Sequence, residues 1–219
     1  MASFQIDFAS SLPLILASQS PRRRELLSLL GVPFTVSVSD APEDRDADVL
    51  ADKQALLIAG RKARAIANRG ARGLILGADT IVVLDGEILG KPTGGDDAKS
   101  MLRRLAGRGH QVITGVVLLD TETGYTRETA VTSTVHMKSA DQVDIDGYVA
   151  TGEPRDKAGA YGIQGLGGAL VDGYEGCFTN IVGLPLCAVA ELLASAGVPV
   201  SPTWAGCQHA SGTSNRKFG

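Results

Sequence analysis

Short apolar runs alternate with amphipathic helical segments along this chain, and this alternation favours a sheet covered by helices. The apolar runs predict strands at 14–17, 34–38, 74–79, 80–84, 87–89 and 177–182, with two more strands around 121–124. The segment after Ser20 and the segments 46–68, 96–106, 141–151 and 185–196 predict helices. We therefore expect an α/β fold, bordering on α+β, in which a mixed sheet is flanked by helices.

Capping and turn residues mark the ends of several of these elements. Ser20 is a typical N-cap, and Pro21 is a typical first residue of a helix. The dipeptide Asp85-Gly86 favours a tight hairpin, and the glycine-rich stretch 159–168 predicts a loop or an irregular strand. Because the chain shows no internal repeat or linker, we expect one domain over 1–219, with its core at about 14–196 and a flexible tail at 201–219.

Charge and composition exclude several classes of protein. A formal net charge of −3 argues against binding a nucleic acid polymer by a broad basic face, since that mode needs many cations opposite the phosphates. The three cysteines lack metal-ligand spacing and are an odd number for a disulfide framework. No apolar run reaches the roughly 20 residues of a membrane span, and the chain does not begin with the basic segment of a signal peptide. We expect a cytoplasmic protein without a membrane partner.

The run Arg22-Arg23-Arg24 opens the first predicted helix, where the helix dipole normally favours acidic residues. Three cations, the backbone N–H groups of a helix start and the hydroxyls of Ser18 and Ser20 together suit a polyphosphate. The same run would also suit a solvated helix surface. Its place directly after a strand favours anion binding, because ligands of open α/β sheets gather at the carboxyl ends of strands.

Other polar residues are weaker candidates when each is taken alone. Asp79 follows the apolar run 74–78 and could equally be a turn residue, while Lys62, Lys91 and Glu43 could be solvated side chains. Gln164 lies among glycines, where its amide could present both donors and acceptors to a base. Neither a phosphate-binding glycine loop nor a zinc pattern is present, so the three histidines are interpreted as structural or surface residues.

Four motifs together resemble the Maf family of nucleotide pyrophosphatases. They are LASQSPRRRELL from Leu16, GADT from Gly77, GKP from Gly90 and KAGAYGIQG from Lys157. The resemblance extends from about Leu14 to Leu193, and the second and fourth motifs resemble the dTTP/UTP branch more than the 7-methyl-GTP branch. It implies a fold related to inosine triphosphate pyrophosphatases, with a bent sheet and a nucleotide cleft between two lobes.

The resemblance also implies roles for individual residues. Asp79 matches the catalytic proton acceptor, and Arg23, Thr80 and Gln164 match the substrate-specificity positions. Polar residues of the phosphate cleft are matched by Ser18, Arg22, Lys62 and Lys91, with Glu43 on the metal side. Where the family often has two adjacent acids, this chain has Pro42-Glu43. A divalent cation, Mg²⁺ or Mn²⁺, is the implied cofactor, and many members form homodimers.

These observations predict hydrolysis of dTTP and UTP, or of modified pyrimidine nucleotides, to the monophosphate and pyrophosphate. Water would attack the α-phosphorus with Asp79 as its base, while Arg22, Lys62 and Lys91 neutralise the leaving group. Two alternatives stay open at this point. One is a 7-methyl-GTP pyrophosphatase, and the other is a nucleotide-binding regulator of cell division that acts without turnover.

Overall fold

A computed structural model describes residues 12–46, 48–201 and 209–210. Within them, eight strands form one mixed sheet in the order β2-β1-β3-β5-β6-β7-β8, and β4 pairs with β3. The strands are β1 (Leu14–Leu16), β2 (Phe34–Val36), β3 (Leu74–Leu84), β4 (Glu87–Leu89), β5 (Gly109–Asp120), β6 (Thr126–Met137), β7 (Val171–Cys177) and β8 (His209–Ala210). The predicted mixed α/β architecture is confirmed.

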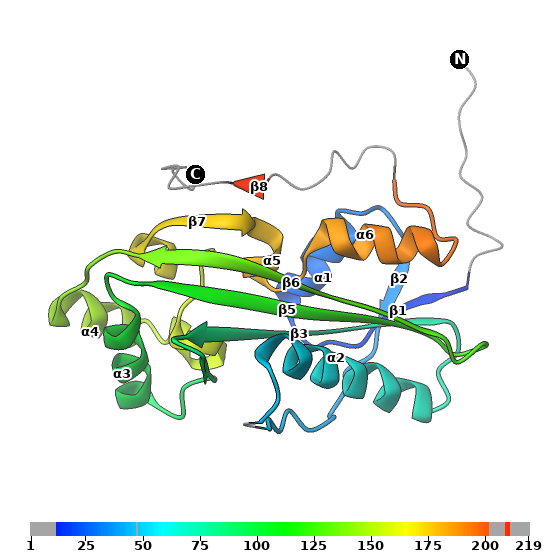
Figure 1. Cartoon of the computed structure of the whole chain (residues 1–219), viewed down its shortest axis with the longest axis horizontal. Coiled ribbons are helices and arrows are strands. Elements are labelled where there is room, and N and C mark those ends of the chain that lie inside the picture. The colour runs from blue at the N-terminus through cyan, green and yellow to red at the C-terminus, as the bar shows by residue number, and fades with distance from the viewer. Residues whose placement is uncertain (1–11, 47, 202–208, 211–219) are drawn as a thin grey trace, which may run out of the picture.

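Helices cover both faces and one end of this sheet. They are α1 (Pro21–Ser28), α2 (Ala51–Asn68), α3 (Gly95–Leu105), α4 (Gln142–Ala150), α5 (Phe178–Val182) and α6 (Leu186–Ser195), with three short 3₁₀ helices at Glu153–Asp156, Ala158–Ala160 and Leu166–Leu170. The long strands β3, β5 and β6 connect an end that carries α3 and α4 to an end that carries β1, β2 and α6 (Figure 1). None of the described helices is both long and apolar enough to cross a membrane.

Local signals placed most elements correctly. Ser20 caps α1 by accepting a hydrogen bond from the N–H of Arg23, with Pro21 as the first helical residue. The predicted hairpin is confirmed, and both Asp85 and Gly86 adopt positive φ, at 51° and 83°. The helix predicted from Asp46 begins only at Ala51. The stretch 159–168 begins and ends in 3₁₀ turns and has no regular structure at 161–165, in agreement with a loop.

The strand predicted at 177–182 is wrong. Strand β7 ends at Cys177, and residues Phe178–Val182 form the short helix α5, which ends at Gly183 with φ of +125°. The apolar, β-branched run is strand-like in composition, but tertiary contacts decide its structure. The side chain of Asn180 donates hydrogen bonds to Val112 O and Ser133 Oγ, both at 2.9 Å, and these bonds hold the turn against the sheet.

A second correction concerns the end of the central strand. The sequence predicted one strand that ended at Asp79 and another at 80–84, whereas β3 runs without interruption through both. Strand β5 pairs with it from Leu74 to Val83, so the ladder continues past the carboxylate. Asp79 therefore lies in the middle of a strand. The tail predicted at 201–219 lies outside the described residues, apart from Ser201 and the short strand β8.

Helix α2 lies unusually close to the sheet. A Cβ atom on Gly77 of β3 would be 2.1 Å from the carbonyl oxygen of Ala59, and one on Gly115 of β5 would be 2.5 Å from the backbone of Ala55. Only glycine permits this approach. The close packing brings Lys62 of α2 next to β3.

One edge of β3 is open over part of its length. Strand β1 pairs with it only up to Leu76, and β4 pairs with it only from Val82 onward. Among the described residues, no strand pairs with this edge between Gly77 and Ile81. Side chains alternate between the two faces of a strand, so a ligand at this gap can reach both faces at once.

Candidate active site

A cavity of about 350 Å³ lies at the open edge of β3, within the range typical of small-molecule sites. Its wall includes all nine residues that the sequence singled out: Ser18, Arg22, Arg23, Glu43, Lys62, Asp79, Thr80, Lys91 and Gln164. They come from β1–α1, the loop before α2, α2 itself, β3, the segment after β4 and the glycine-rich segment. The fold thus brings the nine residues together, while their individual roles stay predictions.

On one face of β3, a buried lysine joins two carboxylates. Lys62 Nζ lies 2.7 Å from Asp79 Oδ1 and 2.7 Å from Glu43 Oε1. The side chains of Lys62 and Asp79 are 9% and 8% exposed, whereas that of Glu43 is 41% exposed. Lys91 Nζ approaches the other oxygen of Glu43 at 3.3 Å. Because an ammonium has three donors, Lys62 keeps one N–H for a further ligand.

The environment of Glu43 favours its ionised form. Partial burial alone would raise the pKa of this carboxyl, but the hydrogen bond and charge of Lys62, together with Lys91, lower it to about 2. Glu43 therefore carries a full negative charge at neutral pH, directly beside the cavity.

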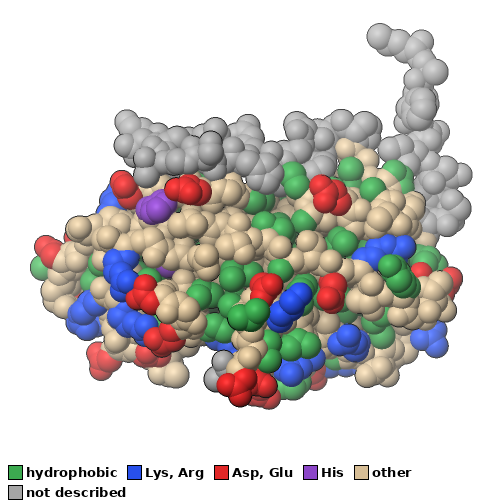
Figure 2. Space-filling model, viewed as in Figure 1, with side chains coloured by type: hydrophobic (Ala, Val, Ile, Leu, Met, Phe, Trp, Pro, Cys, Tyr) green, Lys and Arg blue, Asp and Glu red, His purple; other side chains and the backbone are tan. Residues whose placement is uncertain are grey.

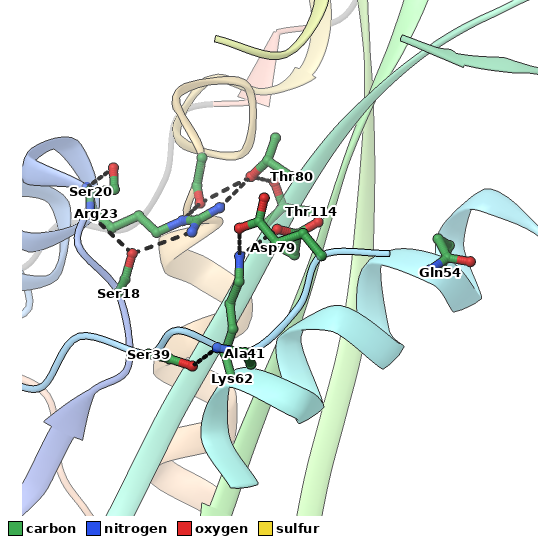
Figure 3. Close-up of polar contacts among 12 residues, drawn as sticks. Ser18, Ser20, Arg23, Ser39, Ala41, Gln54, Lys62, Asp79, Thr80 and Thr114 are labelled. Atoms are coloured by element: carbon green, nitrogen blue, oxygen red, sulfur yellow. Dashed lines mark hydrogen bonds and ion pairs between the residues drawn. The ribbon is translucent and has the colours of Figure 1, made fainter. Parts of the chain in front are cut away.

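On the other face of β3, Arg23 connects three separate parts of the chain. Its Nε donates to Gly183 O at 2.9 Å, its Nη2 donates to Thr80 Oγ1 at 3.0 Å, and its Nη1 donates to Ser18 Oγ at 3.4 Å. Figure 3 shows Arg23 reaching from α1 toward Thr80 while Lys62 reaches Asp79 from α2. Desolvation lowers the pKa of Arg23, and the charges of Asp79 and Glu43 oppose this shift.

The remaining predicted residues lie at the rim of the cavity. The Arg22 side chain is 35% exposed, and its Nη1 is 3.8 Å from Asp156 Oδ2, a loose pair that contributes little to stability. Lys91 and Gln164 are exposed. These groups are accessible to a charged ligand. On the face shown in Figure 2, basic and acidic side chains are interspersed over the surface.

The acidic side of the cavity fits a hard divalent cation. Asp79 Oδ2 is buried and has no hydrogen-bond partner within the described residues, and the Glu43 carboxylate lies across Lys62 from it. The described chain contains no cluster of three or more His, Cys, Asp or Glu side chains suited to a metal. Two carboxylates suit Mg²⁺ only if phosphate and water oxygens supply its other ligands.

Several residues of the cavity carried no role in the sequence analysis. Arg45 adds a further cation to the wall, and Lys157 and Tyr161 contribute from the KAGAYGIQG motif. Lys157 Nζ donates to Glu153 O and to Asp156 Oδ1, both at 2.7 Å, so it stabilises this segment. Gly183 could not be identified in advance, because the segment before it was misassigned as a strand.

Comparison with known proteins yields consistent matches over most of the chain. Residues 13–196 match the family described as Maf-like protein. A dTTP/UTP pyrophosphatase of Desulforamulus reducens is 44% identical over 188 residues, which cover 86% of this chain and 98% of the relative. The dTTP/UTP pyrophosphatase of Alkaliphilus metalliredigens is 49% identical over 82% of this chain and 94% of its own. That of Moorella thermoacetica is 50% identical over 85% of this chain and 96% of its own.

Proposed function

This chain belongs to the Maf family, and on that premise we propose that it hydrolyses dTTP and UTP to the nucleoside monophosphate and pyrophosphate. The relatives named above carry this activity in their names. One observation carries the proposal on the structural side. Asp79, whose buried Oδ2 has no hydrogen-bond partner among the described residues, lines a cavity whose wall also holds Arg22, Lys62 and Lys91.

Asp79 is proposed as the proton acceptor. Lys62 holds Oδ1 at 2.7 Å and thereby fixes the orientation of the carboxylate, which leaves Oδ2 to accept a proton from the attacking water. The water oxygen bonds to the α-phosphorus as the bond from that phosphorus to the bridging oxygen breaks, and pyrophosphate leaves. A positioned base of this kind contributes about 10²–10⁴ in rate.

The cations are proposed to hold the triphosphate. Arg22 and Lys91 are accessible at the rim, and Lys62 has one N–H left for a phosphate oxygen. Fixed donors directed at the leaving group stabilise the charge that develops there. Glu43 would hold Mg²⁺ or Mn²⁺, and the bound cation would neutralise charge on the phosphate oxygens.

The base is proposed to bind on the opposite face of β3. Uracil and thymine present two carbonyl oxygens and one ring N–H, so a selective site needs donors for the oxygens and an acceptor for the N–H. Arg23 can supply donors, Thr80 can supply an acceptor, and the amide of Gln164 can supply both. Cytosine replaces one carbonyl with an amino group, and a buried mismatch of this kind costs about 1–3 kcal/mol. We expect UTP and dTTP to be preferred over CTP by at least about tenfold.

One experiment tests this function directly. Pyrophosphate release is measured side by side from dTTP, UTP, CTP, GTP and 7-methyl-GTP, with added Mg²⁺ or Mn²⁺. Preferential release from dTTP and UTP supports the proposal. A preference for 7-methyl-GTP would assign the chain to the other branch, and tight nucleotide binding without release would make it a binding protein. Cytoplasmic location, a homodimer and a single domain stay predictions from the sequence.

A further inference from the structure

The hydroxyl of Thr80 lies within hydrogen-bond distance of three neighbours. Its Oγ1 is 3.0 Å from Arg23 Nη2, 2.9 Å from Thr114 Oγ1 and 3.4 Å from Gly183 O. We propose that Thr114 is a positioning residue for substrate selection, because it takes up the only hydroxyl proton of Thr80 and leaves Thr80 an acceptor toward the base. This inference rests on the proposed function, whose base-binding end it deepens.

The direction of the hydrogen bonds follows from counting protons. A threonine hydroxyl has one proton and two lone pairs. Thr114 Oγ1 is 3.2 Å from the backbone carbonyl oxygen of Asn180, which can only accept, so Thr114 donates there. Thr114 must then accept from Thr80 across the 2.9 Å contact. Arg23, which can only donate, occupies one lone pair of Thr80. The second lone pair is left for a ligand.

The reverse arrangement is less favourable. If Thr114 donated to Thr80, the protein acceptor left for the proton of Thr80 among the described contacts would be Gly183 O at 3.4 Å, beyond the usual range for O–H···O bonds. Gly183 O already accepts from Arg23 Nε at 2.9 Å. The oxygens of Thr114 and Asn180 would also face each other at 3.2 Å without a proton between them. A buried acceptor pair of this kind is costly.

Burial of Thr114 and Asn180 stabilises this direction of the hydrogen bonds. Thr114 and Asn180 are both 0% exposed, so water cannot take either place in the chain of hydrogen bonds. The Asn180 side chain is itself held by Val112 O and Ser133 Oγ, both at 2.9 Å, which fixes α5 and its carbonyl groups over the sheet. Thr114 therefore acts without touching the nucleotide.

The consequence for substrate choice is specific. A base atom that meets Thr80 must be a donor, as the ring N–H of uracil and thymine is. The corresponding ring nitrogen of cytosine is an acceptor and would face a lone pair. Without the hydroxyl of Thr114, the hydroxyl of Thr80 could rotate and donate, and cytosine would no longer be penalised at this position.

The test compares Thr114→Val, which removes the hydroxyl at nearly constant shape, with Thr114→Ser, which retains it. The ratio of kcat/KM for UTP to that for CTP should fall about tenfold in Thr114→Val, or about 1.4 kcal/mol, and stay near the wild-type value in Thr114→Ser. Most of the change should come from faster use of CTP. If the valine variant does not fold, Thr114→Ala, which also lacks the hydroxyl, takes its place.

Two results would overturn the assignment. An unchanged UTP-to-CTP ratio in the variants without the hydroxyl would show that Thr80 selects the base unaided, and an equal loss in Thr114→Ser would show that only packing matters. Binding of UMP and CMP is measured calorimetrically on the same proteins. If the wild type released no pyrophosphate from UTP or CTP, the proposed function would fail, whereas the change in UMP-to-CMP affinity between wild type and variant would still decide the role of Thr114.

Discussion

Asp79 and Thr80 are adjacent in the sequence, but their side chains lie on opposite faces of β3. Asp79 Oδ1 pairs with Lys62 of α2, and Thr80 Oγ1 pairs with Arg23 of α1. Among the described residues no strand pairs with this edge of β3 between Gly77 and Ile81, and both side chains line the same cavity. In the proposed function, the triphosphate binds on the Asp79 side of this edge and the base on the Thr80 side.

Replacing Asp79 with Asn should lower turnover by about 10²–10⁴ while nucleotide affinity stays nearly unchanged. The amide oxygen can still accept from Lys62, but an NH₂ group replaces the proton-accepting Oδ2. Steady-state pyrophosphate release and calorimetric binding of dTTP measure the two effects. Asp156→Asn, at the same cavity, is the control and should leave turnover high. Near-normal turnover in Asp79→Asn would reduce Asp79 to a structural partner of Lys62.

Replacing Arg22 with Ala should weaken triphosphate binding without lowering the melting temperature. A cation at a helix start is unfavourable by about 0.3–1 kcal/mol, and the loose pair with Asp156 at 3.8 Å offsets little of this. Arg24→Ala is a matched control, because Arg24 is exposed in the same turn of α1. Both variants should melt at or above the wild-type temperature, and only Arg22→Ala should lose dTTP affinity. A sharp fall in melting temperature with intact affinity would make the arginine structural.

Replacing Gln164 with Glu should reduce hydrolysis of dTTP and UTP more than it reduces binding of inorganic triphosphate. The substitution converts amide donors into acceptors beside the base. Gln19→Glu adds the same charge elsewhere on the cavity wall and should affect all triphosphates alike. Assays with UTP, CTP and inorganic triphosphate separate the two effects. An unchanged UTP-to-CTP preference in Gln164→Glu would remove this residue from base recognition.

Replacing Glu43 with Gln should raise the Mg²⁺ concentration needed for half-maximal activity by about tenfold or more, since a neutral amide is a poorer ligand for a hard cation. The pKa of about 2 keeps Glu43 ionised through the accessible pH range, so the wild type should show no acid limb from this group above pH 4. Glu25→Gln, at an exposed acid of α1, is the control. An identical Mg²⁺ titration for Glu43→Gln would place the metal elsewhere.

His110 should make the fold less stable in mild acid. Burial lowers the pKa of its imidazole from 6.5 to about 4. Between these values the unfolded chain binds a proton that the folded chain excludes, so the free energy of unfolding falls as the pH falls, by about 2 kcal/mol between pH 7 and pH 5. Urea titrations of His110→Gln should lack this contribution, and those of His136→Gln should retain most of it, because burial of His110 lowers its pKa more than the charge of His136 does. Equal slopes in all three proteins would contradict the assignment.

Features encoded by neighbouring residues were predictable from the sequence. Ser20 and Pro21 specify the start of α1 within one turn, and Asp85-Gly86 specifies its hairpin, because each acts on adjacent backbone groups. The cavity residues were identified largely by family resemblance. These residues meet along an open edge of β3 because β1 ends before it and β4 begins after it. No local sequence pattern predicts where those two strands pair.

Features that depend on distant partners were not predictable in this way. Residues 178–182 form a helix because Asn180 binds residues 68 and 47 positions earlier in the chain. Thr114 gave no signal in the sequence, since one threonine within a long apolar strand is ordinary until Thr80 and Asn180 are placed beside it. Asp79 was read as the end of a strand because its polarity interrupts an apolar run that in fact continues.

The bond from Arg23 to Gly183 spans 160 positions of the chain and therefore sets an order of events during synthesis. Helix α1 is synthesised before α5, so the guanidinium of Arg23 cannot bind Gly183 O until the segment that contains α5 has left the ribosome. Strands β1 to β7 and helix α2 all precede α5 in the chain. The contact that holds Arg23 beside Thr80 therefore cannot be complete before Gly183 has been synthesised.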